Sequence, residues 1–341
     1  MEKLILFIIS VVISFAITPL VKKFAKKVGA IDIPKDERKI HKKPIPLLGG
    51  LSIYTAFVLV LILKKEALTT EEIGILISAS VIVLGGVIDD LKELKPYVKL
   101  IFQVVAALIL IKFGTSIKII TNPFSASNLY LNLKFLSVPL TIMWVVGITN
   151  AFNLIDGLDG LAAGVAFISS ITIFIIAIIN NRADAAILTI ILSGAILGFL
   201  PYNFNPASIF MGDTGSQLLG FLLAAISITG AIKSAAAFAI SVPILALGLP
   251  IYDTLFAVIR RKINGKPIMK ADRGHLHHRL LDMGLSQKKA VLIMYIISAI
   301  LGGISIIAME ISNQRAYFLV TAVIIIIVLI AWKVGFFEHR E

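Results

Sequence analysis

Apolar runs long enough to cross a lipid bilayer follow one another along almost the whole chain. Of its 341 residues, 58% are hydrophobic and 15% are charged, a composition typical of a polytopic membrane protein and not of a soluble domain. A spanning helix needs about 20 apolar residues and satisfies its backbone hydrogen bonds internally. The sequence therefore predicts one all-α integral-membrane domain, residues 1–341, with about eleven transmembrane helices. They are expected at residues 4–21, 47–63, 73–88, 98–112, 136–152, 161–179, 185–202, 215–231, 236–259, 289–308 and 316–334.

The basic residues predict how the chain is oriented in the membrane. Nine Lys or Arg lie in residues 22–46 and eight in residues 260–288, whereas the richest loop on the opposite face, residues 112–135, holds three. Cytoplasmic loops carry the excess of positive charge, so both basic loops are expected in the cytoplasm. An odd number of crossings then places the N-terminus outside and the C-terminus in the cytoplasm. The net charge of +12 is not a nucleic-acid signal, because it lies beside the membrane.

Two further features limit the chemistry. The chain has no cysteine, which excludes a disulfide framework, a thiolate nucleophile and a Cys-based zinc site. Residues 115–135 alternate weakly in hydrophobicity, which predicts a small exposed hairpin on the outer face. We assign no chemistry to that hairpin.

Asparagine and aspartate recur between two apolar runs, in the stretch that ends at Gly160. Asn150, Asn153, Asp156 and Asp159 are spaced every third residue. On a helix each step turns the side chain by about −60°, so only successive pairs share a face. Two glycines within the stretch indicate a helix that ends in a tight loop. The stretch is either a polar loop that ends a membrane helix or a site for a charged or polar ligand.

Adjacent carboxylates end the predicted helix at residues 73–88. Asp89 and Asp90 repel each other, so they either bind a cation or are neutralised by Lys92, Lys95 or Lys99. Their position at a helix end places them on the predicted cytoplasmic side.

A third carboxylate, Asp213, precedes the predicted helix at residues 215–231 and is followed by Thr214 and Ser216. It could be an ordinary helix N-cap. The same helix start, with free amide groups, is also suited to hold a phosphate.

The loop at residues 260–288, which follows the predicted helix at residues 236–259, is rich in histidine. His275, His277 and His278 lie between Arg273 and Arg279. Their spacing does not match a zincin site, and imidazoles beside arginines are suited to phosphate oxygens. The alternative is a basic loop held near anionic lipid.

These groups share one membrane face and call for a common explanation. Carboxylates that bind Mg²⁺ or Mn²⁺, together with cationic side chains, are what the transfer of a phosphoryl or phosphosugar group requires. A site at the cytoplasmic membrane face can receive a water-soluble donor from one side and a lipid acceptor from the bilayer. The residues therefore favour a membrane-bound phosphotransferase.

The motifs resemble the polyprenyl-phosphate N-acetylhexosamine-1-phosphate transferases, glycosyltransferase family 4, and within them the WecA/TagO branch. The resemblance rests on the segments 41–50, 89–90, 150–160, 210–216 and 275–278. It implies an enzyme of the bacterial cytoplasmic membrane that transfers N-acetylglucosamine 1-phosphate from UDP-N-acetylglucosamine to undecaprenyl phosphate. It also implies dependence on Mg²⁺ or Mn²⁺ and release of UMP.

The resemblance also implies roles for single residues. Asp213 would bind the metal, with Asp89 and Asp90 beside both the metal and the lipid phosphate. The remaining candidates are catalytic or substrate-binding: Asp156 and Asp159 with Asn150, Asn153 and Asn203 at the nucleotide sugar, and His275, His277, His278, Arg273 and Arg279 at its pyrophosphate or sugar.

Several alternatives stay open. A transferase of phospho-N-acetylmuramoyl-pentapeptide has three consecutive histidines in this loop, whereas Leu276 interrupts the run here. A cation-coupled transporter would place its ionisable residues near the bilayer midplane, and no inverted repeat supports it. Asp253 matches a family pattern but could simply pair with a loop cation. The sequence leaves open the downstream polymer and the formation of a homodimer, because lipid-facing and subunit-facing surfaces have similar compositions.

Overall fold

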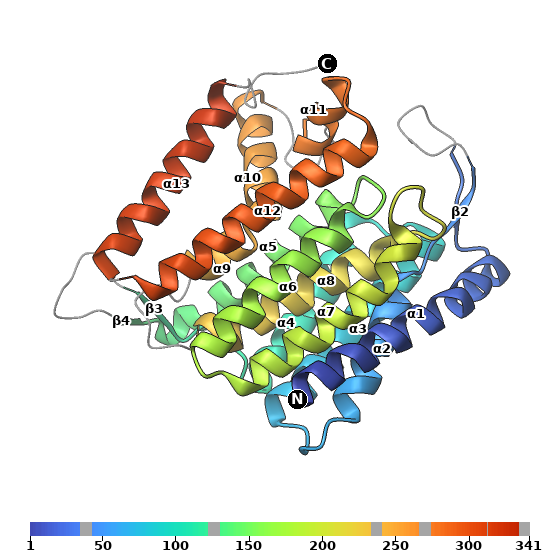
Figure 1. Cartoon of the computed structure of the whole chain (residues 1–341), viewed down its shortest axis with the longest axis horizontal. Coiled ribbons are helices and arrows are strands. Elements are labelled where there is room, and N and C mark those ends of the chain that lie inside the picture. The colour runs from blue at the N-terminus through green and yellow to red at the C-terminus, as the bar shows by residue number, and fades with distance from the viewer. Residues whose placement is uncertain (35–42, 122–129, 233–240, 266–273, 312, 334–341) are drawn as a thin grey trace.

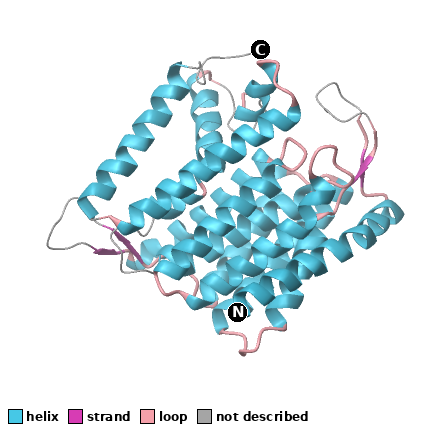
Figure 2. Cartoon of the chain, viewed as in Figure 1, coloured by secondary structure: helices cyan, strands magenta, loops and turns pink. Residues whose placement is uncertain are grey.

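A computed structural model describes residues 1–34, 43–121, 130–232, 241–265, 274–311 and 313–333. Within them the chain folds almost entirely into helices, which pack side by side as a bundle (Figures 1 and 2). The elements are, in order, α1 (Glu2–Val28), β1 (Ile31–Asp32), β2 (Ile45–Pro46), α2 (Gly50–Ile62), α3 (Thr70–Lys92), α4 (Pro96–Lys112), β3 (Ile119–Thr121), β4 (Tyr130–Asn132), the 3₁₀ turn η1 (Lys134–Leu136), α5 (Ser137–Ile155), α6 (Leu161–Ile179), α7 (Ala183–Asn203), α8 (Gly212–Ser227), the π-helical turn η2 (Ile228–Ile232), α9 (Ser241–Ala246), α10 (Gly248–Ile263), α11 (Leu276–Asp282), α12 (Gln287–Glu310) and α13 (Asn313–Lys333).

The prediction of an all-α polytopic membrane protein is confirmed. Six helical segments of the described chain are long and apolar enough to cross a bilayer: α1, α3, η1 with α5, α6, α7 and α12. Helix α2 and residues 318–333 of α13 are shorter apolar helices. Large apolar side chains on α1 and α13 are exposed, among them Phe15, Phe318 and Trp332. A bilayer can cover such surfaces, and water cannot do so without cost.

The expectation of a single helix at residues 236–259 is wrong. In the described part of that range the helix is interrupted at Leu247, and α9 and α10 lie on either side. Pro250 explains the break, because it has no N–H to donate to the carbonyl of Ala246. That carbonyl accepts a hydrogen bond from Ser169 Oγ at 2.9 Å instead. A neighbouring helix thus satisfies the backbone group that the proline leaves free.

Two short antiparallel ribbons lie at the ends of the helices. Strands β1 and β2 pair Ile31 with Pro46, next to the end of α1. Strands β3 and β4 pair Ile119 with Asn132, which confirms the antiparallel pairing of the predicted hairpin, and its place on the outer face stays a prediction.

Helix α8 lies in the middle of the bundle and contacts α2, α3, α5, α6 and α7. All residues from Thr214 to Ser227 are buried. Glycines allow the neighbouring backbones to approach it closely: a Cβ on Gly50 would overlap the backbone of Gly215, and one on Gly86 would overlap that of Thr214. Small residues at such crossings are typical of helices that pack inside membranes. The first turn of α8 is therefore held tightly against α2 and α3.

This packing predicts that Gly86→Ala destabilises the protein. A helix interior normally favours Ala over Gly by about 1 kcal/mol, but overpacking here costs about 1–3 kcal/mol because the obstacle is backbone. We expect a lower midpoint of thermal unfolding in detergent. Gly147→Ala in α5 is the matched control, since nothing lies within 4 Å of its Cβ position, and its midpoint should stay or rise. Equal midpoints for the two variants would contradict the close contact of α3 and α8.

Candidate active site

A cavity of about 1060 Å³ opens where the ends of α3, α5 and α7 meet the starts of α4 and α8. Its lining includes residues near the end of α1 and, from the C-terminal part of the chain, His278 and Gln287. Segments far apart in the sequence thus share one end of the bundle. The predicted site residues that line it are Asp89, Asp90, Asn153, Asp156, Asp159, Asn203, Asp213 and His278.

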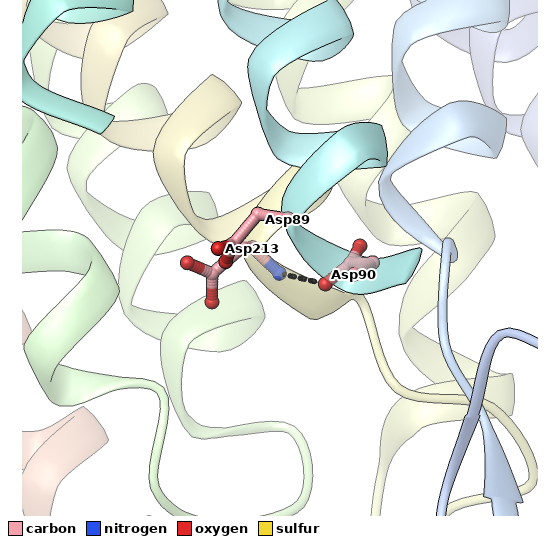
Figure 3. A group of neighbouring side chains, drawn as sticks. All are labelled: Asp89, Asp90 and Asp213. Carbon is pink, nitrogen blue, oxygen red and sulfur yellow. Dashed lines mark hydrogen bonds between the residues drawn. The ribbon is translucent and has the colours of Figure 1, made fainter. Parts of the chain in front are cut away.

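Three carboxylates form a cluster in this cavity. Ligand atoms of Asp89, Asp90 and Asp213 lie within 4.8 Å of one another, and Figure 3 shows Asp89 and Asp213 side by side. The ammonium of Lys99 lies 2.6 Å from Asp89 Oδ2 and 2.6 Å from Asp213 Oδ2. The cluster therefore binds a positive charge between two of its members, and it is a group of hard oxygen ligands that could hold a metal ion.

Asp90 fixes the start of α8. Its Oδ1 accepts from the amide of Asp213 at 2.8 Å (Figure 3). Its Oδ2 accepts from the Thr214 hydroxyl at 2.6 Å. The amide of Thr214 also donates to Oδ2, at 3.2 Å. The N-cap residue is Met211, which provides no side-chain hydrogen bond, so the interpretation of Asp213 as the N-cap is wrong. A carboxylate at this helix end is favourable because the first amides of a helix have no partner within it.

Asp213 lies in the first turn of α8, where three side chains donate to its carboxylate. Asn153 Nδ2 donates to Oδ1 at 3.1 Å, and Lys99 and Gln217 donate to Oδ2 at 2.6 and 3.2 Å. Asn153 also donates to the hydroxyl of Ser216 at 2.9 Å. The orientation of Asp213 is thus fixed by α4, α5 and α8 together.

Asn150 does not line the cavity. Its amide donates to Gln103 Oε1 at 2.7 Å and to the carbonyl of Val146 at 2.8 Å. Gln103 in turn donates to Gln217 Oε1 at 3.1 Å. These amides, of which those of Gln103 and Gln217 are buried, join α4, α5 and α8. Contact of Asn150 with substrate stays a prediction, and its position favours a supporting role.

Asp159 and Asp156 lie on the loop after α5 and differ in their partners. Asp159 Oδ2 accepts from Asn205 Nδ2 and from the amide of Ala207, both at 3.0 Å, so it holds the loop after α7. Asn205 also donates to Gln287 Oε1 at 2.7 Å. The carboxyl group of Asp156 has no hydrogen-bond partner within the described chain. Burial, and then the negative charges of nearby aspartates including Asp213, raise the pKa of Asp156 to about 8.

The second amide of the predicted pocket, Asn203, ends α7. Its Nδ2 donates to the carbonyl of Ile209 at 3.1 Å. Its Oδ1 is buried without a partner in the described part of the chain. Asn203 lines the cavity, but this oxygen is itself buried.

The histidines have different surroundings. His275 is buried and its Nδ1 lies 2.7 Å from Asp253 Oδ2. His277 is buried against Gly157, where an added Cβ would overlap its imidazole. Burial, and then the charge of His278, lower the pKa of His277 to about 3, so this ring is neutral. Of the three, His278 is the one that lines the cavity.

The two predicted arginines do not both fall within the structure. Arg279 is buried, and its Nε donates to the carbonyl of Gly274 at 3.0 Å. Arg273 lies outside the described residues.

Sequence reasoning missed four polar residues that hold the site. Gln103 and Gln217 interrupt apolar helices, which was a signal that could have been used. Asn205 and Gln287 gave no signal, because polar residues are ordinary in loops and at helix starts.

Comparison with known proteins identifies the family of this chain. Residues 72–231 match the glycosyl transferase family 4. A Bacillus subtilis protein named "Probable undecaprenyl-phosphate N-acetylglucosaminyl 1-phosphate transferase" is 39% identical over 334 residues, which are 98% of this chain and 92% of that protein. The chain belongs to glycosyl transferase family 4.

Two further relatives are less similar to this chain than the Bacillus subtilis protein. The undecaprenyl-phosphate alpha-N-acetylglucosaminyl 1-phosphate transferase of Thermotoga maritima is 31% identical, over 94% of each chain. The phospho-N-acetylmuramoyl-pentapeptide-transferase of Clostridium beijerinckii is also 31% identical, over 89% of this chain and 94% of its own. The family match covers the carboxylate cluster and the loop after α5, whereas the histidines lie beyond it.

The raised pKa of Asp156 gives a prediction for stability. Its carboxyl titrates near 3.8 when unfolded and at about 8 when folded, so the folded state keeps a proton that the unfolded state loses. Wild-type stability should therefore fall between about pH 4 and pH 8. Asp156→Asn removes the titrating group, so this variant should not show that fall in stability. The difference between its unfolding midpoint and that of wild type should therefore grow from pH 5 to pH 8 and then level off.

The measurement is thermal unfolding in detergent with EDTA across this pH range. Asp184→Asn is the control, because Asp184 is exposed in the first turn of α7, and that variant should follow wild type. A gain for Asp156→Asn that does not change with pH would contradict the raised pKa.

Proposed function

We propose that this protein transfers N-acetylglucosamine 1-phosphate from UDP-N-acetylglucosamine to undecaprenyl phosphate. The products are undecaprenyl-diphospho-N-acetylglucosamine and UMP. The observation that carries the proposal is the cluster of Asp89, Asp213 and Lys99 in a polar cavity at the helix ends, in a chain 39% identical to a protein named for this reaction.

The reaction is a single displacement at phosphorus. An oxygen of the lipid phosphate attacks the β-phosphorus of the nucleotide sugar, and the bond from that phosphorus to the oxygen bridging it to UMP breaks. The lipid phosphate is already largely ionised near neutral pH, so the site has to orient it and screen its charge. Lys99, at 2.6 Å from two carboxylates, and His278, in the cavity wall, are suited to meet the phosphates.

The carboxylate cluster fits Mg²⁺ or Mn²⁺. Its donors are carboxylate oxygens, which these ions prefer, and Lys99 shows that positive charge is accommodated between Asp89 and Asp213. Asp213 and Asp89 would hold the ion, with Asp90 fixing the helix that carries Asp213. When bound, the ion would neutralise charge on the phosphates of the donor.

The remaining residues would bind the donor. Asn153, Asp156, Asp159 and Asn203 all line the cavity. His277 would act through Gly157 and His278, and His275 would act through His277, because neither of these rings lines the cavity.

The cavity belongs at the cytoplasmic face of a bacterial cytoplasmic membrane. It lies at the bundle end where α1 ends. The basic stretch at residues 22–46 begins in the last turns of α1, and positive segments beside a membrane helix stay in the cytoplasm. About eleven crossings, with the N-terminus outside and the C-terminus inside, agree with this placement. There the water-soluble donor and the lipid acceptor can reach one site. Association of two copies stays a prediction.

The second candidate donor is UDP-N-acetylmuramoyl-pentapeptide. The Clostridium beijerinckii relative named for that substrate is 31% identical, which keeps it as the alternative. Leu276 between the histidines argues against it.

The decisive experiment measures UMP release by the purified protein in detergent. We expect release that requires both undecaprenyl phosphate and UDP-N-acetylglucosamine and that stops with EDTA. Release only with the muramoyl-pentapeptide donor would move the protein to the second candidate. No release with either donor from a folded sample would refute the transferase function.

A separate prediction concerns Asp213. Asp213→Asn removes one charge from the cluster, and we expect a loss of at least about 100-fold in kcat, as for loss of one preorganised electrostatic group. Asp184→Asn at the exposed start of α7 is the matched control and should keep wild-type turnover. Near-normal turnover of a folded Asp213→Asn protein would exclude an essential role.

A further inference from the structure

A buried carboxylate beside the histidines lies outside the cavity and has no role in the function proposed above. Asp253 in α10 is 4% exposed, and it pairs with His275, which is also 4% exposed. His275 Nδ1 lies 2.7 Å from Asp253 Oδ2, and the amide of Leu276 donates to Asp253 Oδ1 at 2.8 Å. A buried carboxylate is costly unless it is paired and hydrogen-bonded. Both oxygens of this one are engaged by the start of α11.

The pair fixes the first turn of α11 and the state of one ring. A carboxylate only accepts, so Nδ1 of His275 carries the proton. His275 is the N-cap of α11 in an extended conformation and makes no side-chain cap bond of its own, so Asp253 accepts from the first amide instead. Two turns along α10, the guanidinium of Arg260 packs where a Cβ on Gly274 would lie. Helix α10 thus holds the start of α11 at two points.

From this anchor the imidazoles lead to the cavity. The rings of His275 and His277 are nearly parallel, with centroids 5.8 Å apart and planes at 9°. The ring of His278 follows at 4.2 Å from that of His277, and His278 lines the cavity. His277 also packs on Gly157, next to Asp156. A shift of His275 would therefore move His278, which lines the cavity. It would also move His277, which contacts the loop after α5 at Gly157.

We propose that Asp253 is a positioning residue that sets the place of His278, and thereby the binding of the nucleotide-sugar donor. The inference rests on the transferase function proposed above, because it takes His278 as a group that meets the donor. Asp253 itself touches neither the cavity nor the carboxylate cluster. Its loss should weaken donor binding and leave binding of the lipid phosphate unchanged.

The first test compares KM values in the UMP-release assay. Asp253→Ala removes two hydrogen bonds to a charged group, and we expect KM for the nucleotide sugar to rise about 10- to 100-fold, with KM for undecaprenyl phosphate unchanged. Asp253→Asn keeps an acceptor for the Leu276 amide but places a donor at Nδ1, so the ring must hold its proton on Nε2. We expect a smaller rise for Asp253→Asn.

The second test repeats these changes in a His278→Ala background. If Asp253 acts through His278, Asp253→Ala should add little to the donor KM there, because directly coupled residues are not additive. The same fold-change in both backgrounds would overturn the proposal. A rise in KM for both substrates would also overturn the proposal, and so would an unchanged KM for the donor. Where the alanine variant does not survive purification, Asp253→Asn carries the same comparison.

The control is a buried carboxylate far from the cavity. Glu72 is 1% exposed at the start of α3, where its Oε2 accepts from Lys64 at 2.6 Å and from the Thr69 amide at 2.8 Å. Glu72→Gln should lower the unfolding midpoint without changing the donor KM. A rise in donor KM for this variant would show that destabilisation alone causes the effect and would overturn the assignment. Wild-type turnover in the same assay separates this outcome from failure of the proposed function.

Discussion

The hydrogen bonds between Asp90 and the first turn of α8 determine where the rest of the site lies. The amides of Asp213 and Thr214 have no partner within the helix, and the N-cap Met211 offers none. Unpaired amides near the hydrocarbon core cost several kcal/mol, so the carboxylate at the end of α3 satisfies a strong requirement. The same contact brings Asp89 beside Asp213. Completing a helix end thus also creates the carboxylate cluster.

Glycines and side-chain amides keep that contact in place. Lipid is as apolar as leucine, so helices in a bilayer associate through close packing and interhelical hydrogen bonds. Gly50 and Gly86 provide the close packing on one side of α8. The amides of Gln103, Asn150 and Gln217 provide the hydrogen bonds on the other. Each of these polar groups would cost free energy if it lay between helices without a partner. Here they hydrogen-bond to one another, which removes most of that cost.

The sequence predicts the helices of this protein better than it predicts the contacts of its site. Length and apolarity suffice to predict a membrane helix. The break at Leu247 also depends on Ser169, a residue of another helix, whose hydroxyl donates to the carbonyl of Ala246. The spacing of Asn150 and Asn153 places them on the same face of α5, and only the neighbouring helices decide that Asn153 turns to Asp213 and Asn150 to Gln103. Lys99 and Asp213 are 114 residues apart, a pairing that no local pattern contains.

The partners of each aspartate decide what its substitution can reveal. Asp90 and Asp159 hold the start of α8 and the loop after α7, so removing either carboxylate changes both structure and charge. Asp89 and Asp213 share Lys99, so a change at one alters the other. Among these five aspartates, Asp156 has no side-chain hydrogen bond to lose in the described structure. Burial and neighbouring negative charges determine the pKa of its carboxyl group. Asp156→Asn therefore measures the electrostatic cost of the site without removing a side-chain hydrogen bond.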